Sequence, residues 1–218
     1  MPADYIVGPS SAPVAELLDA SETAWAKAQA ISWGPAPWIT RFRALATQAA
    51  LALRFDVYDE RPWHTMTRRD EHIWEEEVVE IFLDPDRTGT NYYELEINPA
   101  NVVCDLVVPR PWPELHSDPA WDFAGLDTRV RPYRGEGAGP DGWTATAWLP
   151  WDGFRTLPAA ASLPPGDGDR WRFNVYRIKR PHGPARPHDD VINAAWSPTG
   201  SPSFHVPSAF GNFVFKRD

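Results

Sequence analysis

Residues 51–59 read Leu-Ala-Leu-Arg-Phe-Asp-Val-Tyr-Asp, with apolar side chains at 51, 53, 55 and 57. Alternation with a period of two is typical of a strand that buries one face. Runs of similar character follow at 79–83, 93–98, 101–108, 143–149, 171–178 and 212–215. Turn-forming clusters rich in Pro, Gly and Asp occur at 84–89, 135–142 and 164–169. The pattern predicts an all-β fold, a two-sheet antiparallel β-sandwich.

The alternation also predicts which side chains meet between the two sheets. They are Phe55, Val57, Val79, Ile81, Leu95, Ile97, Ala145, Phe173 and Val175. The helical candidates, at 12–30 and 151–154, are short, so we expect helical turns only. No linker, repeat or low-complexity tail interrupts the chain, and we expect residues 1–218 to form a single domain.

Twelve of the 218 residues are tryptophan. Each buried indole N–H needs an acceptor, so we expect about two-thirds of the tryptophans in or against the core and the others on a surface. An exposed aromatic plane stacks on another flat face, such as a sugar ring, a base or a Pro-rich peptide. The net charge of −9 opposes phosphate binding. We therefore expect no nucleic acid partner, whereas a neutral saccharide is compatible with this charge.

The remaining composition limits the cellular setting. No apolar run approaches the roughly 18 residues of a membrane span, so we expect no membrane partner. The start, Met1-Pro-Ala-Asp-Tyr5, has neither the basic residues nor the apolar run of a signal peptide. We expect a cytoplasmic protein, with secretion left open. The single cysteine, Cys104, excludes an internal disulfide.

Residues 63–80 hold the densest mixture of aromatic and charged side chains, Trp-His-Thr-Met-Thr-Arg-Arg-Asp-Glu-His-Ile-Trp-Glu-Glu-Glu-Val-Val-Glu. The segment is too polar to be predicted as core. It is either a solvated charged loop or a binding loop, since loops on a rigid sandwich commonly carry recognition residues. In the second interpretation Trp74 offers a ring face, and Glu80 accepts hydrogen bonds from two sugar hydroxyls.

Several motifs in one order resemble a known family. Residues 74–84, Trp-Glu-Glu-Glu-Val-Val-Glu-Ile-Phe-Leu-Asp, resemble the signature of family 9 carbohydrate-binding modules. Further similar segments are 19–28, 91–99, 170–174, 196–199 and 210–212, so the resemblance extends along nearly the whole chain. It implies a β-sandwich that binds a mono-, oligo- or polysaccharide, with a role in carbohydrate catabolism.

The resemblance also implies a set of site residues. In the family two tryptophans sandwich a sugar unit; the first falls on Trp74 and the second on Phe204. The family's carboxylate ligand falls on Glu80, and its arginine falls on Glu96, which reverses the charge. Tyr176 and Ser201 stand where the family has Gln and Asn. As candidates for the rim we add Arg68, Arg69, Asn98, Arg177 and His205.

The runner-up function is a carbohydrate-active enzyme, similar to glycoside hydrolases, that uses a carboxylate pair in the same cleft. Glu94 and Glu96 share one face of a strand. If they face the cleft with Glu80, their repulsion raises at least one carboxyl pKa, and that carboxyl has the proton that an acid catalyst needs. If Arg68, Arg69 or Arg177 neutralises Glu96, the site is a binder. We favour the second outcome.

The sequence shows no motif for an organic cofactor, and we predict none. Calcium remains open because members of the family carry it, with Asp84 and Asp86 as candidate ligands, although a plain turn at 84–89 is favoured. A minor alternative is a b-type haem-binding domain, in which Met66 and either His64 or His72 would be the axial ligands.

Overall fold

The chain is built almost entirely from strands. The computed structural model describes residues 3–118, 120–133, 141–156 and 162–217, and 42 % of these are in strands against 12 % in helices. The helical segments, all short, are α1 (Val14–Leu18), α2 (Glu22–Trp25) and the 3-10 turns η1 (Ile73–Glu75), η2 (Trp151–Thr156), η3 (Gly183–Ala185) and η4 (Pro207–Ala209). The prediction of short helical turns only is confirmed. Most of the turn cluster predicted at 135–142 lies outside the described residues.

Thirteen strands are described, and their bounds place every predicted strand within a few residues. They are β1 (Asp4–Pro9), β2 (Ala30–Trp33), β3 (Thr40–Ala46), β4 (Ala50–Tyr58), β5 (Val78–Asp84), β6 (Tyr92–Ile97), β7 (Val103–Arg110), β8 (His116–Asp118), β9 (Asp127–Tyr133), β10 (Gly142–Pro150), β11 (Arg170–Lys179), β12 (Ile192–Ala195) and β13 (Gly211–Phe215).

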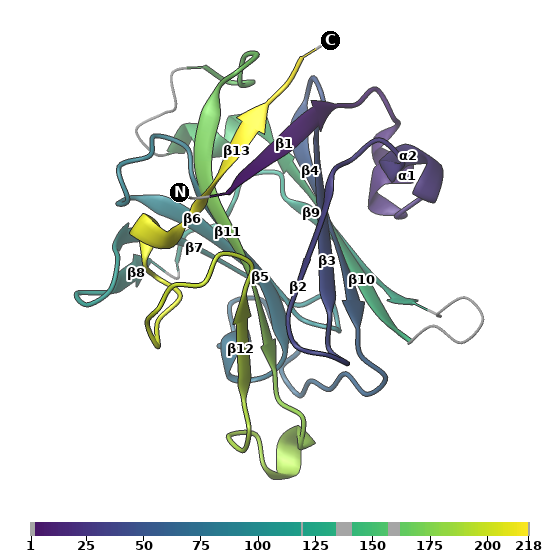
Figure 1. Cartoon of the computed structure of the whole chain (residues 1–218), viewed down its shortest axis with the longest axis vertical. Coiled ribbons are helices and arrows are strands. Elements are labelled where there is room, and N and C mark those ends of the chain that lie inside the picture. Colours follow the sequence, from purple (N-terminus) through teal and green to yellow (C-terminus); the bar gives the residue numbers. More distant parts are fainter. Residues whose placement is uncertain (1–2, 119, 134–140, 157–161, 218) are drawn as a thin grey trace.

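The strands form two sheets that share β1 (Figure 1). The first sheet has the order β8-β7-β6-β5-β11-β13-β1, with β12 paired to the second half of β11. The second sheet has the order β1-β3-β4-β10-β9, with β2 on β3. Strand β1 pairs through residues 4–7 with β13 and through residues 8–9 with β3, in parallel both times. The sandwich is therefore mixed, and the expectation of a purely antiparallel one is wrong at this strand.

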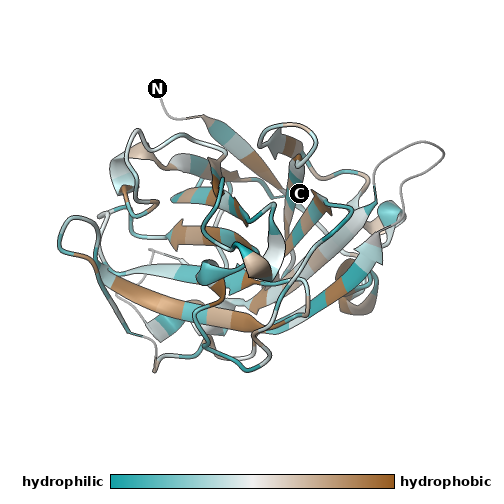
Figure 2. Cartoon of the chain, turned by 90° about the horizontal axis from the view of Figure 1, so that it is seen from below, coloured by the Kyte–Doolittle hydropathy of each residue, from teal (hydrophilic) through white to brown (hydrophobic). Residues whose placement is uncertain are grey.

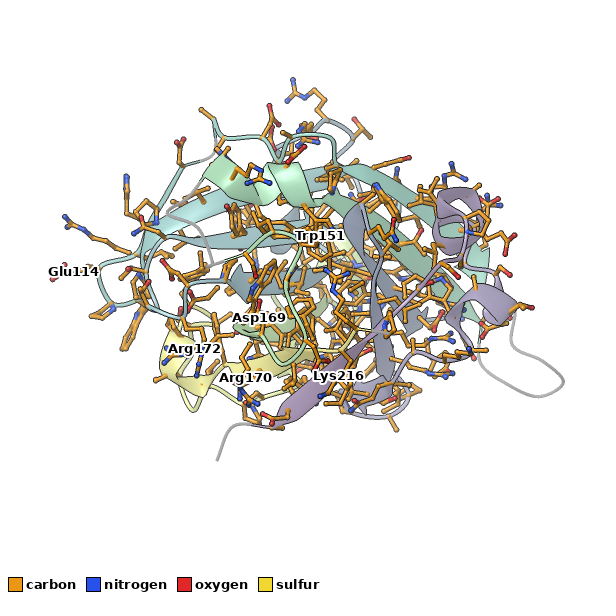
Figure 3. The ribbon with its side chains drawn as sticks, turned by 90° about the horizontal axis from the view of Figure 1, so that it is seen from above. Glu114, Trp151, Asp169, Arg170, Arg172 and Lys216 are labelled. Carbon is orange, nitrogen blue, oxygen red and sulfur yellow. The ribbon has the colours of Figure 1, made fainter. Side chains whose placement is uncertain are left out.

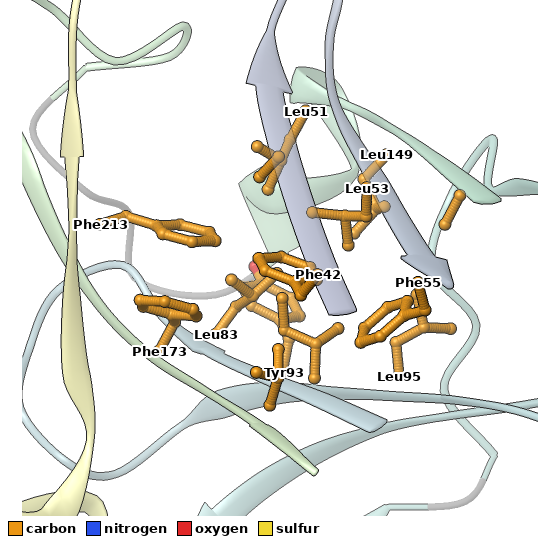
Figure 4. Packing of buried hydrophobic residues seen from close by; sticks show 14 of the residues in the cluster. Phe42, Leu51, Leu53, Phe55, Leu83, Tyr93, Leu95, Leu149, Phe173 and Phe213 are labelled. Atoms are coloured by element: carbon orange, nitrogen blue, oxygen red, sulfur yellow. The ribbon is translucent and has the colours of Figure 1, made fainter. Parts of the chain in front are cut away.

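The main core lies between the sheets. All nine predicted core residues belong to it, together with a group of aromatic rings around Phe42, Phe173 and Phe213 (Figure 4). The rings of Phe173 and Phe213 stack with their centroids 3.8 Å apart. Apolar side chains concentrate on the strands, while the loops are mostly hydrophilic (Figure 2).

The tryptophans also pack mainly inward. All twelve lie in the described ranges; Trp112 alone is exposed, and Trp25, Trp33, Trp143, Trp151 and Trp171 are buried. The other six are partly buried, so these six and Trp112 are the tryptophans with accessible ring surface. Trp74, in η1, is one of these six.

Candidate functional site

The outer face of the first sheet is covered rather than open to solvent. Because side chains alternate along a strand, Val79 and Ile81 of β5 point into the core while Glu80 and Phe82 point outward. The outer face is otherwise largely apolar, with two clusters that include Cys104, Leu106 and Ile178 in one and Phe82, Tyr92, Val108 and Tyr176 in the other. Three glutamates lie among these apolar side chains.

The three glutamates are Glu80, Glu94 and Glu96, and the strand register brings them together. Glu80 of β5 is directly opposite Glu96 of β6, and Glu94 lies two residues before Glu96 on the same face. One carboxylate oxygen from each lies within 4.8 Å of the other two. Their exposed fractions are only 2 %, 4 % and 1 %. The cluster is thus a buried acidic floor on an apolar sheet face.

A hollow of about 400 Å³ opens above this floor. Its walls come from η1, β7, the loop after β7, β11, β12 and the segment after β12. That last segment, yellow-green in Figure 1, lies beside β6 and β8, and the loop after β7 projects outward with Glu114 near its tip (Figure 3). The lining residues are Trp74, Glu80, Glu94, Glu96, Leu106, Leu115, Ser117, Ile178, Arg180, Asn193, Pro202, Ser203, Phe204 and His205.

Two half-buried aromatic rings line the hollow. Trp74 stacks on the ring of His72, with centroids 4.4 Å apart and an interplanar angle of 21°. Phe204 stacks on the ring of Tyr176, with centroids 4.2 Å apart and an angle of 18°. Each ring is therefore supported by a second ring, which leaves little side-chain entropy to lose when a ligand is bound.

Tyrosine hydroxyls hold the segment that carries Phe204. The Tyr176 hydroxyl donates to the Phe204 carbonyl at 3.0 Å, and the Tyr92 hydroxyl contacts His205 Nδ1 at 2.8 Å. The His205 ring also stacks on Phe82 at 4.8 Å. Tyr176, the position where the family resemblance implies a direct polar ligand, instead lies under Phe204 and positions it.

We expect Tyr176→Phe to lower the free energy of unfolding by about 1 kcal/mol, because one part-buried hydrogen bond is lost while the stacked ring remains. Urea denaturation measures this loss. A ligand of the hollow should bind only slightly more weakly to the variant. A loss of binding as large as that of a Trp74 variant, without loss of stability, would make the hydroxyl itself a ligand.

Arg180 is the one arginine that lines the hollow within the described residues. Its guanidinium donates to the carbonyls of Trp74 at 3.1 Å, Glu76 at 3.0 Å and Pro187 at 2.7 Å. It therefore fixes the backbone of η1, and with it the ring of Trp74, rather than pairing with the acidic floor.

Burial dominates the electrostatics of the floor. It raises the pKa of Glu94 to about 7, and together with the neighbouring carboxylates it raises the pKa values of Glu80 and Glu96 well above their usual range. Burial lowers the pKa of His205 to about 4, so its imidazole is neutral at pH 7 although it lies 3.9 Å from Glu94. The floor keeps part of its protons when the hollow holds no cation.

The structure places several predicted site residues elsewhere. Arg68 is exposed and pairs with Glu71, while Arg69 pairs with Asp105 and Asp122. Asn98 is fully buried, and its side-chain oxygen accepts from the Ala100 and Val102 amides. Ser201 lies in a turn beside the lining residues, with its hydroxyl accepting from the Ser203 amide. As candidates for the rim of this hollow, the two arginines and Asn98 are wrong.

Arg177 is also wrong as a rim residue. It points into the sandwich, where its guanidinium pairs with Asp59 at 2.8 Å and Glu77 at 3.4 Å. Lys179 pairs with the same two carboxylates. The 63–80 segment is therefore less solvated than its composition indicates, since Glu77 is fully buried and Glu76 nearly so.

These positions overturn the outcome favoured for Glu96. Arg68, Arg69 and Arg177 all pair with other carboxylates, so the expectation that one of them neutralises Glu96 is wrong. Glu94, whose alternation with Glu96 is visible in the sequence, belongs to the site. Arg180, Leu115 and Asn193 also line it, and no local motif marks them.

The other candidate ligand groups form local structure. The Asp84 carboxylate accepts from the Gly89 amide at 3.0 Å, and Asp86 accepts from the Thr88 amide and hydroxyl. This is the hydrogen bonding of the plain turn, and calcium binding there stays a prediction. Met66 packs in the apolar cluster with Ile73 and Trp74.

A second hollow, of about 270 Å³, lies at another place on the surface. Trp38, Tyr58, Asp59, Arg61 and Lys179 are among its lining residues. It has aromatic and charged side chains, but its two buried charges, Asp59 and Lys179, are already paired. We take it as the alternative location for a ligand.

None of the described helical segments has the length and apolar character of a membrane span.

Comparison with known proteins confirms the resemblance inferred from the motifs. Residues 12–110 match the family model described as carbohydrate-binding family 9. These residues include Trp74 and all three glutamates, but not Phe204. No curated protein matches significantly.

Solved structures confirm the fold. A candidate carbohydrate-binding protein from Bacteroides uniformis is 16 % identical, with a TM-score of 0.74 over 99 % of this chain and 100 % of that one. A family 9 carbohydrate-binding module from Caldicellulosiruptor kristjanssonii in complex with cellotriose is 15 % identical, with a TM-score of 0.67 over 99 % and 95 %. A family 9 module from the same organism in complex with glucose is 16 % identical, with a TM-score of 0.67 over 99 % of this chain and 97 % of that one.

Proposed function

From the premise that residues 12–110 carry the sequence pattern of carbohydrate-binding family 9, we propose that the protein binds a saccharide in the hollow above Glu80, Glu94 and Glu96. The two neighbours solved in complex with cellotriose and with glucose support a sugar as the ligand class. The observation that carries the proposal is the pairing of two ring-supported aromatic walls with unpartnered carboxylate oxygens in one hollow.

The walls suit a sugar because a pyranose presents an apolar C–H face and a polar edge. Trp74 is the stacking platform, and Phe204 is the opposing wall. Glu80 accepts hydrogen bonds from the polar edge, since its Oε1 is buried without a partner among the described residues. An unmade hydrogen bond of a buried carboxylate is costly, so a ligand that supplies the donor recovers that free energy.

The geometry supports a binder better than a glycoside hydrolase. In hydrolases the two carboxyl groups flank the scissile bond, about 5–5.5 Å apart in retaining enzymes and about 6.5–9.5 Å apart in inverting ones. Here one oxygen from each of the three glutamates lies within 4.8 Å of the other two, on one face of two neighbouring strands. A sugar fits above this group but not between its members.

We expect Trp74→Ala to weaken saccharide binding by about 1–3 kcal/mol, by analogy with the loss of an aromatic platform under a nucleic acid base. Thermal stability should change little, because the Trp74 ring is only half-buried. Titration calorimetry with cellotriose and a differential scan measure the two quantities. Trp38→Ala, in the second hollow, is the matched control and should bind normally. If Trp38→Ala lost binding and Trp74→Ala kept it, the site would lie in the second hollow.

A further inference from the structure

The acidic floor lacks a cationic partner. Glu80 Oε1, Glu94 Oε2 and Glu96 Oε2 are buried without a hydrogen-bond partner, and no lysine or arginine of the described residues forms an ion pair with them. All three side chains line the hollow, so the floor borders the space that a ligand would occupy. Three carboxylates this close need compensating positive charge or bound protons.

The neighbouring side chains do not provide that charge. His205 is neutral at pH 7, as its lowered pKa shows, and Arg180 directs its donors to three backbone carbonyls. The side chains around the floor are otherwise mainly apolar, with Phe82, Leu106 and Ile178 nearby. The compensating charge must come from protons or from a ligand.

The dimensions of the floor fit a primary ammonium group. An ammonium has three N–H donors and no acceptor. Three oxygens placed tetrahedrally around one nitrogen, each at roughly 2.9 Å, lie roughly 4.7 Å apart. The three glutamates supply one oxygen each, and no two of these oxygens are more than 4.8 Å apart, so one nitrogen can lie within hydrogen-bond distance of all three. Calcium takes 6–8 oxygen ligands, so it would need both oxygens of all three carboxylates or additional water, because the surrounding side chains are mainly apolar.

We propose that the hollow selects an amino sugar, a saccharide whose free protonated amine is held by Glu80, Glu94 and Glu96 while its ring lies against Trp74 and Phe204. This inference rests on the proposed saccharide site and names its ligand class. Charge-assisted hydrogen bonds are about twice as strong as neutral ones, and a cation near the Trp74 ring gains further attraction. A neutral sugar satisfies the floor only with hydroxyl donors, and leaves more of its charge uncompensated.

The test is a titration of the wild-type protein at pH 7 with three matched trisaccharides. They are the β-1,4-linked trimer of glucosamine, its fully N-acetylated form, and cellotriose. We expect the glucosamine trimer to bind at least about 10-fold more tightly than cellotriose, a difference of about 1.4 kcal/mol. The N-acetylated trimer should have no such advantage, because its nitrogen carries no charge.

Two variants and one additive complete the test. Glu80→Gln/Glu96→Gln should abolish the preference for the amine, so that the glucosamine trimer binds no more tightly than cellotriose. Glu114→Gln, which removes the same kind of charge from the exposed loop, should keep the preference.

Equal or tighter binding of cellotriose by the wild type would overturn the inference and leave the proposed function intact. Binding of cellotriose that requires calcium and is abolished by EDTA would also overturn it, in favour of a metal on the floor. Binding of none of the sugars would overturn both proposals.

Discussion

Replacing Arg177 with methionine is expected to lower the free energy of unfolding by about 3–5 kcal/mol, because removal of one partner of a buried ion pair leaves the opposite charges uncompensated. Arg177 is 1 % exposed, and its guanidinium donates to Asp59, Glu77 and the carbonyls of Val78 and Ile178. It also lies over the ring of Trp143. In the variant, Lys179 alone faces two buried carboxylates.

Urea denaturation of Arg177→Met measures the loss, and Arg68→Met is the control. The Arg68 side chain is 82 % exposed, so its replacement should change stability by no more than about 0.5 kcal/mol. Saccharide affinity of the folded Arg177→Met protein should remain close to that of the wild type. If the Arg177→Met protein remained as stable as the wild type but lost its affinity for the saccharide, Arg177 would be a binding residue.

Replacing Glu94 with glutamine should stabilise the ligand-free protein by about 3 kcal/mol at pH 8. Burial raises the pKa of Glu94 to about 7 from 4.5, and each unit corresponds to about 1.36 kcal/mol. Between these two values the unfolded chain has released a proton that the folded protein still holds. Wild-type stability therefore falls as the pH rises from about 4.5 to about 7, and the cost is complete above pH 7.

The pH dependence separates this effect from ordinary repacking. At pH 4 the carboxyl is protonated in the folded protein and largely so in the unfolded chain, so Glu94→Gln should have almost no effect there. Urea denaturation of both proteins at pH 4 and pH 8 gives the comparison. Equal stability at pH 8 would mean that the Glu94 charge is already compensated in the ligand-free protein. Glu94→Gln is expected to raise the stability of the protein and to weaken its binding of an amine, because stability and function often conflict at a binding site.

Period-two alternation predicted the strands whose outward residues are polar. It located β4, β5, β6, β10 and β11 and named their core residues correctly. It missed β3, in which Arg43 is buried by pairing with Asp56 and with Glu22. Arg43 lies on the outer face of β3, while Phe42, Ala44 and Ala46 face the core. The apolar Leu45, also on the outer face, obscures the alternation. Strand β1, which makes the sheet mixed, was also missed, because Tyr5, Ile6 and Val7 are three consecutive apolar residues without alternation, although only Tyr5 and Val7 are buried.

Prediction of the site from the sequence also fails where the partners of a residue are distant in sequence. The family signature and the alternation of 80, 94 and 96 placed Trp74, Glu80 and Glu96 together, and Phe204 also lies in the hollow. Arg177 is not a rim residue, because it continues the inward series of Phe173 and Val175. Its partners Asp59 and Glu77 are 118 and 100 residues away, so no local pattern reveals them.

A crystal structure of the protein with a bound oligosaccharide is the most direct test of the proposed saccharide site. We predict a sugar ring against Trp74 and Phe204, with one of its polar groups hydrogen-bonded to Glu80. A sugar bound instead against Trp38 and Tyr58 in the second hollow, with no sugar above the three glutamates, would contradict the proposed site.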